Sequence, residues 1–395
     1  MSIHTISSKS SSDSLQSDSS EFSSPDHLAP AVAGPMVWDR LDAAKYIIEL
    51  SPREVQDIRA AVIKVKIAGI PRSDIQQDTF DLANPELARR LSLVSKNLHD
   101  GQGVVVVRGL DAANFNDEEA VVAFAGVCSY VCPKRATDSY ANQTLKCAHF
   151  ILGHVRDATR EKVPTWAKDI GLAGSKITAA MDFHSDRFSG DVLALYVRND
   201  GGSRSGGEQF VASFWRIYNE LLARDPEVLE TMAEANWPFE LKQKDGDPYL
   251  EYGPTLFLSK GKPMCQLVKA PLLGTPLISR DQRMPTVTAK QMHAMHAVGE
   301  LAKRFCTQLD RKQGDIQFIN NLSIMHARQA YSGNNGKPST RHLLRMFLRD
   351  PENAWEKPAQ FRSNFDDPFT PGRQQNLPII DTDPWRIISG RESHG

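Results

Sequence analysis

A histidine and an aspartate stand two positions apart, just ahead of a strand-like apolar run, in MDFHSDRFSGDVLALYV, residues 181–197. Alternate side chains of an extended segment lie on the same side, so we expect His184 and Asp186 to project together. Divalent iron accepts imidazole and carboxylate ligands, and two histidines with one carboxylate on one face leave positions open for substrates. The segment therefore predicts two ligands of a metal site, and a second histidine is required from elsewhere.

The best distant partner is His326, which lies in GDIQFINNLSIMHARQAYSG, residues 314–333. A Gly-Asp turn starts a strand-like run that we expect to end at this histidine. With 11 histidines in the chain, one His-x-Asp motif is expected by chance in about one chain of two. A structural core histidine is therefore the alternative role for His326.

Two arginines stand in a largely apolar run, STRHLLRMFLRD, that follows His326 (residues 339–350). Arg341 and Arg345 would be costly to bury there without an anion. A guanidinium fork matches a carboxylate with two hydrogen bonds, so an arginine beside a metal site suggests capture of a dicarboxylate. An ion pair with an aspartate or glutamate is the competing interpretation for either arginine.

Outside these motifs, helical periodicity and β-like runs share the chain. Helices are expected over 51–67, 84–100, 115–132, 214–235 and 288–309, with Asn116 as an N-cap. Strands are expected in GQGVVVVRGL, DVLALYVRN, EQFVAS, PTLFLS, CQLVKA, DIQFIN and RHLLRMFLR. Strands interrupted by helices without strict βαβ alternation favour an α+β domain built around a β-sandwich or distorted barrel.

Composition excludes several classes of protein. The 395 residues carry a formal net charge of -1, which gives no electrostatic reason to expect nucleic acid or a membrane surface as a partner. No run of 18 or more apolar residues is present. The five cysteines are scattered and odd in number, which favours reduced thiols over a disulfide framework. We expect a cytoplasmic protein whose Ser-rich residues 1–35 form a disordered tail.

Taken together, the motifs resemble the taurine dioxygenase (TauD/TfdA-like) family of iron(II)- and 2-oxoglutarate-dependent oxygenases. The resemblance covers about residues 95–350 and looks most like fungal members. It is carried by His184-Ser185-Asp186, by the HAR at 326–328 and by the RHLLR at 341–345. It also includes the segments GVVVVRGL and SGGEQFVASFWRIYNEL.

The resemblance implies a double-stranded β-helix (jelly-roll, cupin-like) core with flanking helices, in one domain over residues 36–395. It implies that His184, Asp186 and His326 bind Fe(II). It further implies that Arg341 pairs with the distal carboxylate of 2-oxoglutarate, and that Arg345 matches the arginine that binds the substrate's sulfonate. Dioxygen would be the other cosubstrate.

One motif departs from the family pattern. Where taurine dioxygenase has G-G-D-T, with a threonine that helps to hold 2-oxoglutarate, this chain has Gly-Gly-Glu-Gln ending at Gln209. The amide of Gln209 can still donate a hydrogen bond to a carboxylate. His149 and His154 fall in a region that helps to line the substrate pocket in this family, and each could contact substrate or be structural.

The resemblance implies oxidation of an unactivated C–H bond of a small, anionic substrate, such as an amino acid or a secondary-metabolite intermediate. Hydroxylation, desaturation or oxidative cyclisation would accompany release of succinate and CO2. Two alternatives use the same strands: a cupin-like metal hydrolase or isomerase that needs no Arg341, and a non-catalytic β-helix binding module. A homo-oligomer is possible on any of these interpretations.

Two other groups of residues invite a metal or redox role. His293 and His296 are three apart on an expected helix, but no acid stands between them as in H-E-x-x-H, so exposure on an amphipathic helix explains them better. Cys128 and Cys132 would share one helix face, and we interpret them as small buried hydrophobic residues.

Overall fold

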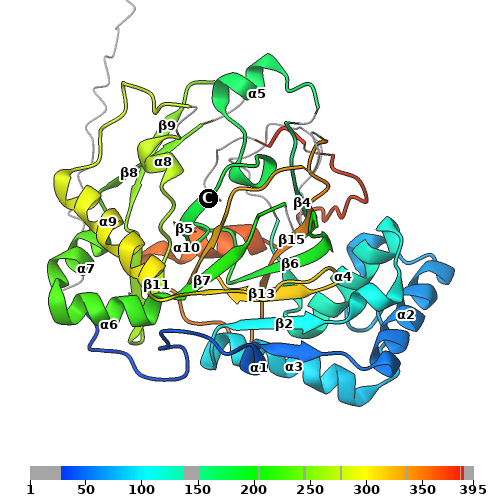
Figure 1. Cartoon of the computed structure of the whole chain (residues 1–395). Helices are drawn as coiled ribbons and strands as arrows, with labels where there is room; N and C mark the ends of the chain where they lie inside the picture. Colours follow the sequence, from blue (N-terminus) through cyan, green and yellow to red (C-terminus); the bar gives the residue numbers. More distant parts are fainter. Residues whose placement is uncertain are drawn as a thin grey trace, which may run out of the picture.

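Two β-sheets form the centre of the molecule (Figure 1). The computed structural model describes residues 28–137, 152–159, 161–202, 205–242, 246–275, 278–333, 337–382 and 384–386. The larger sheet runs in the order β1 (Ile47–Glu49), β2 (Val104–Arg108), β13 (Ile316–Asn320), β6 (Val192–Asn199), β15 (His342–Arg349) and β3 (Lys134–Arg135), with β4 (Gly153–Arg156) also paired with β15. The smaller sheet runs β12 (Cys306–Gln308), β7 (Gln209–Ser213), β14 (Ile324–Arg328) and β5 (Met181–His184).

The valine run of β2 shows why the larger sheet is apolar on both faces. Val105 and Val107 pack into a hydrophobic cluster on the outer face of the sheet, together with residues of three helices. Val104 and Val106 pack into the cluster between the two sheets, where Val211 of β7 and Ile324 of β14 join them. Because successive side chains point to opposite faces, a strand buried on both faces reads as an uninterrupted apolar run.

Helices cover the outer face of each sheet. The larger sheet is covered by α2 (Pro52–Ile67), α3 (Pro85–Asp100) and α4 (Asp117–Val131). The smaller sheet is covered by α6 (Phe214–Arg224), α7 (Pro226–Ala233) and α9 (Ala289–Arg304). Asn116 is the N-cap of α4, as the sequence predicts, and it forms a capping box with Glu119. The result is two helix layers around two sheets.

The expected strand that ends at His326 is in fact two strands, so that part of the prediction is wrong. β13 ends at Asn320, and a turn carries the chain from the larger sheet to β14 in the smaller one. The Asn320 side chain accepts hydrogen bonds from the backbone N–H of Leu322 at 2.9 Å and Ser323 at 3.2 Å. An asparagine that bonds the backbone two residues ahead favours a turn.

Two other expected elements also differ. The expected strand CQLVKA is wrong because β11 (Lys262–Cys265) ends at its first residue, and the following Leu267 accepts a backbone bond from Ser185 instead. The expected helix over 214–235 is divided into α6 and α7 at Asp225, since a residue before proline is disfavoured in the helical conformation. The remaining short elements are α1 (Ala43–Tyr46), α5 (Thr165–Ile170), α8 (Ala270–Leu273), α10 (Arg362–Asp366), β8 (Trp237–Leu241), β9 (Tyr249–Gly253) and β10 (Leu256–Ser259).

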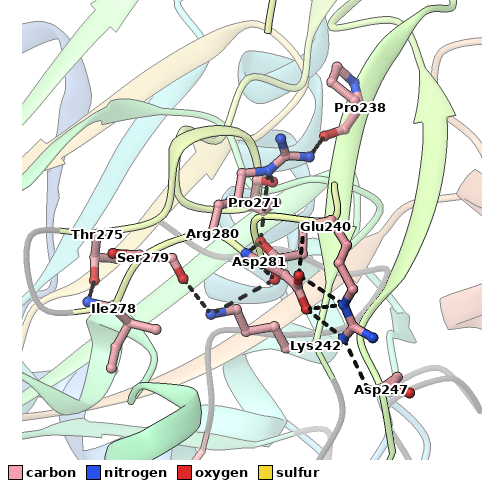
Figure 2. A network of polar contacts seen from close by, with 11 residues as sticks. Pro238, Glu240, Lys242, Asp247, Pro271, Thr275, Ile278, Ser279, Arg280 and Asp281 are labelled. Carbon is pink, nitrogen blue, oxygen red and sulfur yellow. Dashed lines mark hydrogen bonds and ion pairs between the residues drawn. The ribbon is translucent and has the colours of Figure 1, made fainter. Parts of the chain in front are cut away.

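A polar network ties the irregular segment after α8 to strand β8 (Figure 2). Arg280 donates hydrogen bonds to the backbone oxygens of Pro238 at 2.5 Å and Pro271 at 3.3 Å. The backbone N–H of Asp281 donates to the carboxylate of Glu240, with 3.3 Å to each oxygen. Side chains therefore supply the hydrogen bonds that a regular strand would supply through its backbone.

The beginning of the described chain packs on the domain. Residues 1–27 of the predicted tail lie outside the described residues. Tyr218 of α6 donates a hydrogen bond to the backbone oxygen of Ala29 at 2.6 Å, and Asn219 exchanges two bonds with the backbone of Val32, both of 2.8 Å. Within the described part of the chain, no helix is long and apolar enough to cross a membrane.

Candidate metal centre

The two predicted histidines and the aspartate lie together in the structure. β14 pairs with β5 so that His326 stands opposite His184, which is the last residue of β5. Asp186 follows two residues later, and one ligand atom of each residue lies within 4.8 Å of the others. The Asp186 carboxylate is 3.4 Å from Nε2 of His326 and 3.8 Å from Nε2 of His184. The spacing fits a facial set of two imidazoles and one carboxylate.

Backbone contacts fix the orientation of His184. Its Nδ1 atom lies 2.7 Å from the backbone oxygen of Asp182. A carbonyl oxygen can only accept, so Nδ1 carries the proton and Nε2 keeps its lone pair. A metal-binding histidine is usually oriented in this way by a hydrogen bond from its second nitrogen.

Asn321 fixes the peptide of Asp186 and was not identified from the sequence. Its Oδ1 accepts from the backbone N–H of Asp186 at 2.9 Å. Its Nδ2 donates to the backbone oxygens of Asp186 at 2.8 Å and Gly190 at 3.0 Å. Asn321 lies in the turn between β13 and β14, so one turn helps to place both Asp186 and His326.

A cavity of about 580 Å³, open mouth included, borders these three residues. Its walls are mostly apolar, and its charged or amide-bearing side chains are Gln209, Arg328, Arg341 and Arg345 besides Asp186. Apolar walls with a few polar groups are typical of small-molecule sites. The geometry therefore provides room for small organic molecules next to the candidate metal ligands.

Arg341 is a buried cation without a carboxylate partner among the described residues. The side chain is 2% exposed, and its Nε and Nη1 atoms have no hydrogen-bond partner in that part of the chain. Burial, followed by the charges of Arg328 and Arg311, lowers the pKa of Arg341 to about 9. The alternative of an ion pair with a described acid is not seen. A bidentate anion such as a carboxylate would satisfy these atoms.

Arg345 lies in β15 and lines the same cavity as Arg341. Arg341 immediately precedes β15, and every second residue from there (341, 343 and 345) lines the cavity. Four residues of extended chain separate the two arginine Cα atoms by roughly 13 Å. The Arg345 guanidinium packs beside Gly153 of β4. The cavity therefore has two arginines in its wall that could each bind an anionic group.

Gln209 lines the same cavity as the candidate metal ligands. It begins β7, stands opposite Arg328 of β14, and lines the cavity. Its Oε1 atom is buried and has no hydrogen-bond partner among the described residues. The side chain is therefore available to contact a bound molecule.

The other predicted histidines have different outcomes. His149 lies outside the described residues. His154 is buried in β4, and its Nδ1 lies 2.9 Å from Nε2 of His342, whereas the cavity at the metal ligands is lined by the neighbouring Val155. His293 is exposed and pairs with Asp225 at 2.9 Å. His296, on the same helix, is also exposed.

Cys128 and Cys132 are both buried free thiols, as predicted. Burial raises the pKa of the Cys128 and Cys132 thiols well above their usual range. A thiol held in its neutral form is a poor metal ligand and a poor nucleophile. The pair therefore fills space in the core.

Arg328 is a further residue whose contacts the sequence did not indicate. It stands two positions after His326 and donates hydrogen bonds to the backbone oxygens of Ile177 at 3.0 Å and Ala179. Those residues lead into β5 and His184. Only its position in the HAR motif could have drawn attention to it, because its backbone partners leave no signature in their side chains.

Comparison with known families and proteins agrees with this geometry. The sequence profile described as "Taurine catabolism dioxygenase TauD, TfdA family" matches residues 66–347. The chain is 29% identical over 348 residues to "Taurine hydroxylase-like protein SAT17" of Stachybotrys chartarum, covering 88% of this chain and 86% of that protein. It is 21% identical over 345 residues to "FR-33289 synthase" of Streptomyces rubellomurinus, covering 85% of this chain and 95% of that protein.

Solved structures share the fold. An asparagine oxygenase in complex with Fe(II), 3-hydroxyasparagine and succinate is similar with a TM-score of 0.54 and 13% identity, covering 80% of this chain and 99% of that one. The oxygenase OrfP in complex with Fe and α-ketoglutaric acid is similar with a TM-score of 0.52 and 15% identity, covering 77% and 93%. The predicted α+β fold with a jelly-roll core is confirmed. The hydrolase and binding-module alternatives find no support in these comparisons.

Proposed function

The chain belongs to the taurine catabolism dioxygenase TauD, TfdA family, and from this premise we propose a role for each site residue and a class of substrate. It is an oxidoreductase whose cofactors are iron(II) and 2-oxoglutarate, with dioxygen as cosubstrate. The proposed reaction is hydroxylation of an unactivated C–H bond of a small, anionic, amino-acid-like substrate, with release of succinate and CO2. The observation that carries the proposal is the juxtaposition of the three ligands with buried Arg341 in one cavity.

His184, Asp186 and His326 hold the iron in this proposal. Two neutral imidazoles and one carboxylate cancel only part of its charge, which favours binding of an anionic cosubstrate. Iron(II) bound there supplies the dioxygen chemistry that oxidises the substrate while 2-oxoglutarate is converted to succinate and CO2. The protein's own contribution is orientation, through the Asp182 and Asn321 contacts, and exclusion of water by the apolar walls.

Arg341 binds the distal carboxylate of 2-oxoglutarate in this proposal. Its two partnerless nitrogens and its burial away from any described carboxylate support that role. A guanidinium fork gives two parallel hydrogen bonds and so fixes direction as well as position. The cosubstrate would be held in one orientation.

The substrate is proposed to carry an anionic group that binds Arg345. The roughly 13 Å between the Cα atoms of the two arginines leaves the apolar part of the cavity for a short carbon chain. Names of related proteins support a substrate with an acidic group. One relative is called taurine hydroxylase-like, and structural neighbours are bound to hydroxyasparagine and hydroxyarginine. Those names support hydroxylation over desaturation or cyclisation.

Oxygen-dependent release of succinate tests the proposed function. Purified protein with iron(II) and 2-oxoglutarate would be offered taurine, other small sulfonates and acidic or polar amino acids, with product mass measured for each. We expect one group of anionic compounds to stimulate succinate release and to gain one oxygen atom. Loss of two hydrogens without added oxygen would instead show desaturation or ring closure. Stimulation only by amines or amides that lack a carboxylate or sulfonate, offered in the same panel, would contradict the proposed substrate class.

Replacing Gln209 with alanine is expected to raise the KM for 2-oxoglutarate about threefold to tenfold, with kcat little changed. One hydrogen bond from an uncharged donor accounts for an effect of that size. Initial rates of succinate release against 2-oxoglutarate concentration measure it. Gln209→Glu serves as the matched variant, since a carboxylate of the same shape would repel the cosubstrate and raise KM further. An unchanged KM in both variants would remove Gln209 from the site.

Replacing Arg345 with alanine is expected to raise the substrate KM about 10- to 100-fold, because a hydrogen bond to a charged group is lost. The KM for 2-oxoglutarate should stay near the wild-type value, since Arg341 is retained. Arg345→Lys keeps the positive charge but loses the planar guanidinium, so its substrate KM should lie between those of the wild type and Arg345→Ala. Steady-state rates with the best substrate of the panel measure these values. A substrate KM that does not change in the alanine variant would rule out this role.

A further inference from the structure

Strand β5, which carries His184, has few backbone pairs to hold it. It lies at the edge of the smaller sheet, and among the described strands only β14 pairs with it. The register joins His326 to His184 and Arg328 to Met181. Two steps along β14 therefore correspond to three steps along β5, and the pairing shifts between the two positions as it does at a β-bulge.

This shift decides which way the His184 side chain points. Side chains alternate along a strand, so a slip of one residue would turn the imidazole to the other face of the sheet. One extra residue between Met181 and His184 re-aims the side chain, as bulges beside active sites often do. The four residues before β5, 177–180, have no regular secondary structure, and we call them the lead-in segment. Their placement sets where the bulge falls.

Arg328 holds the lead-in segment. Its Nη2 atom donates hydrogen bonds to the backbone oxygens of Ile177 at 3.0 Å and of Ala179. Between these two, the backbone oxygen of Thr178 accepts from the N–H of Tyr331 at 3.0 Å. Three consecutive carbonyl oxygens are thus bound by Arg328 of β14 and by a residue just after that strand.

The contacts of Arg328 are made at an energetic cost. The residue is 6% exposed, and no carboxylate of the described chain pairs with it. Its guanidinium lies 4.8 Å from the ring centroid of Tyr331, and that of Arg341 lies 5.1 Å from the same centroid, so two like charges are close. A buried cation beside another cation is unfavourable. A planar guanidinium can span two carbonyl oxygens, whereas an ammonium group is a point charge, which explains why arginine stands here.

We propose that Arg328 is a positioning residue for the iron site, which holds the lead-in segment and thereby keeps His184 opposite His326. The inference rests on the proposed function, in which these histidines bind iron. Asn321 holds the chain on the other side of His184, through the peptide of Asp186. The two neighbouring ligands are therefore fixed from both directions by residues in β14 or in the turn before it.

Hydrogen exchange of the metal-free protein tests this role without any iron. Arg328→Ala is expected to speed exchange about tenfold or more in peptides that cover residues 177–186 and at the Tyr331 amide, because hydrogen bonds from a charged group are lost. Arg59→Ala is the matched control. Arg59 is exposed on α2 and donates to the backbone oxygen of Ala113 at 3.2 Å. Exchange in residues 177–186 should not change in that variant.

Iron(II) affinity, titrated without oxygen, is the second measurement. It is expected to fall about 10- to 100-fold in Arg328→Ala, as is typical when a residue that orients a metal ligand is lost. Arg328→Lys keeps the charge but cannot span both oxygens, so it should lose most of the same affinity. Because Arg328 lines the cavity, guanidinium ion at a non-denaturing concentration should restore part of the affinity of Arg328→Ala. It should leave the wild type unchanged.

Wild-type exchange and wild-type iron affinity in Arg328→Ala would overturn the inference. A loss of affinity that accompanies a general fall in unfolding temperature, and that guanidinium does not restore, would also overturn it, since Arg328 would then only stabilise the fold. If Arg328→Ala does not fold, the same measurements on Arg328→Lys decide. A wild type that binds no iron(II) would count against the proposed function, and the exchange rates would still test the hold on the lead-in segment.

Discussion

Alanine in place of Asp186 is expected to lower iron-dependent turnover of 2-oxoglutarate by more than about 100-fold. Loss of a residue that only orients a ligand typically costs 10- to 100-fold in metal affinity or activity, and Asp186 is proposed to be a ligand itself. The Asp186 side chain is 3% exposed, and its carboxylate lies within 3.8 Å of the Nε2 atom of each histidine. Succinate release and bound iron per chain are the two measurements.

Thermal unfolding separates lost metal binding from lost folding. A metal that binds only the native state raises the unfolding temperature, so iron(II) should stabilise the wild type and leave Asp186→Ala unchanged. Asp81→Ala is the control, because Asp81 is an exposed acid that pairs with Lys64 far from the site. An Asp186→Ala variant that still binds iron and turns over 2-oxoglutarate near the wild-type rate would contradict the proposed ligand set.

Methionine in place of Arg341 is expected to raise the KM for 2-oxoglutarate about 100-fold or more, while the ligand-free protein becomes more stable. The first effect follows from loss of two charge-assisted hydrogen bonds. The second follows because Arg341 is buried with no described carboxylate, and a buried charge that no opposite charge balances is costly. Kinetics with varied 2-oxoglutarate and chemical unfolding of the ligand-free proteins measure the two effects.

The stability difference between the Arg341→Met variant and wild type is expected to depend on pH. Burial lowers the pKa of Arg341 to about 9 in the folded protein, well below its ordinary value. The folded state therefore binds this proton less tightly than the unfolded state, and the cost is full below pH 9. As pH rises from about 9 toward 12, the wild type loses that cost and the difference narrows. A less stable methionine variant, or an unchanged 2-oxoglutarate KM, would contradict the assignment.

The cluster of candidate metal ligands was predictable from the sequence where its geometry is local. His184 and Asp186 are close in the chain, so strand alternation is enough to bring them together. His326 needed a second strand to be placed beside β5, and only the combined motifs indicated it. In the structure His326 stands opposite His184. The strand that was expected to lead to His326 is divided in two at the turn after Asn320.

Other parts of the site were not predictable because they depend on long-range backbone contacts. Asn321 reaches the peptide of Asp186, 135 positions away, and an asparagine in a turn carries no mark of such a partner. Arg328 donates hydrogen bonds to backbone oxygens, so these contacts do not depend on the side chains of the accepting residues. The hydrogen bond from Lys176 to Asp381 joins residues 205 positions apart. Only the folded arrangement shows which of the many charged residues are buried together.

Anaerobic titration of the metal-free protein with iron(II) and then 2-oxoglutarate tests the central claim most directly. The account predicts the weak visible charge-transfer band of a keto acid chelated to iron(II) in the wild type. It predicts no band in Asp186→Ala, and a band that needs far more 2-oxoglutarate in Arg341→Met. A folded wild-type protein that binds iron(II) but shows no band at saturating 2-oxoglutarate would contradict it.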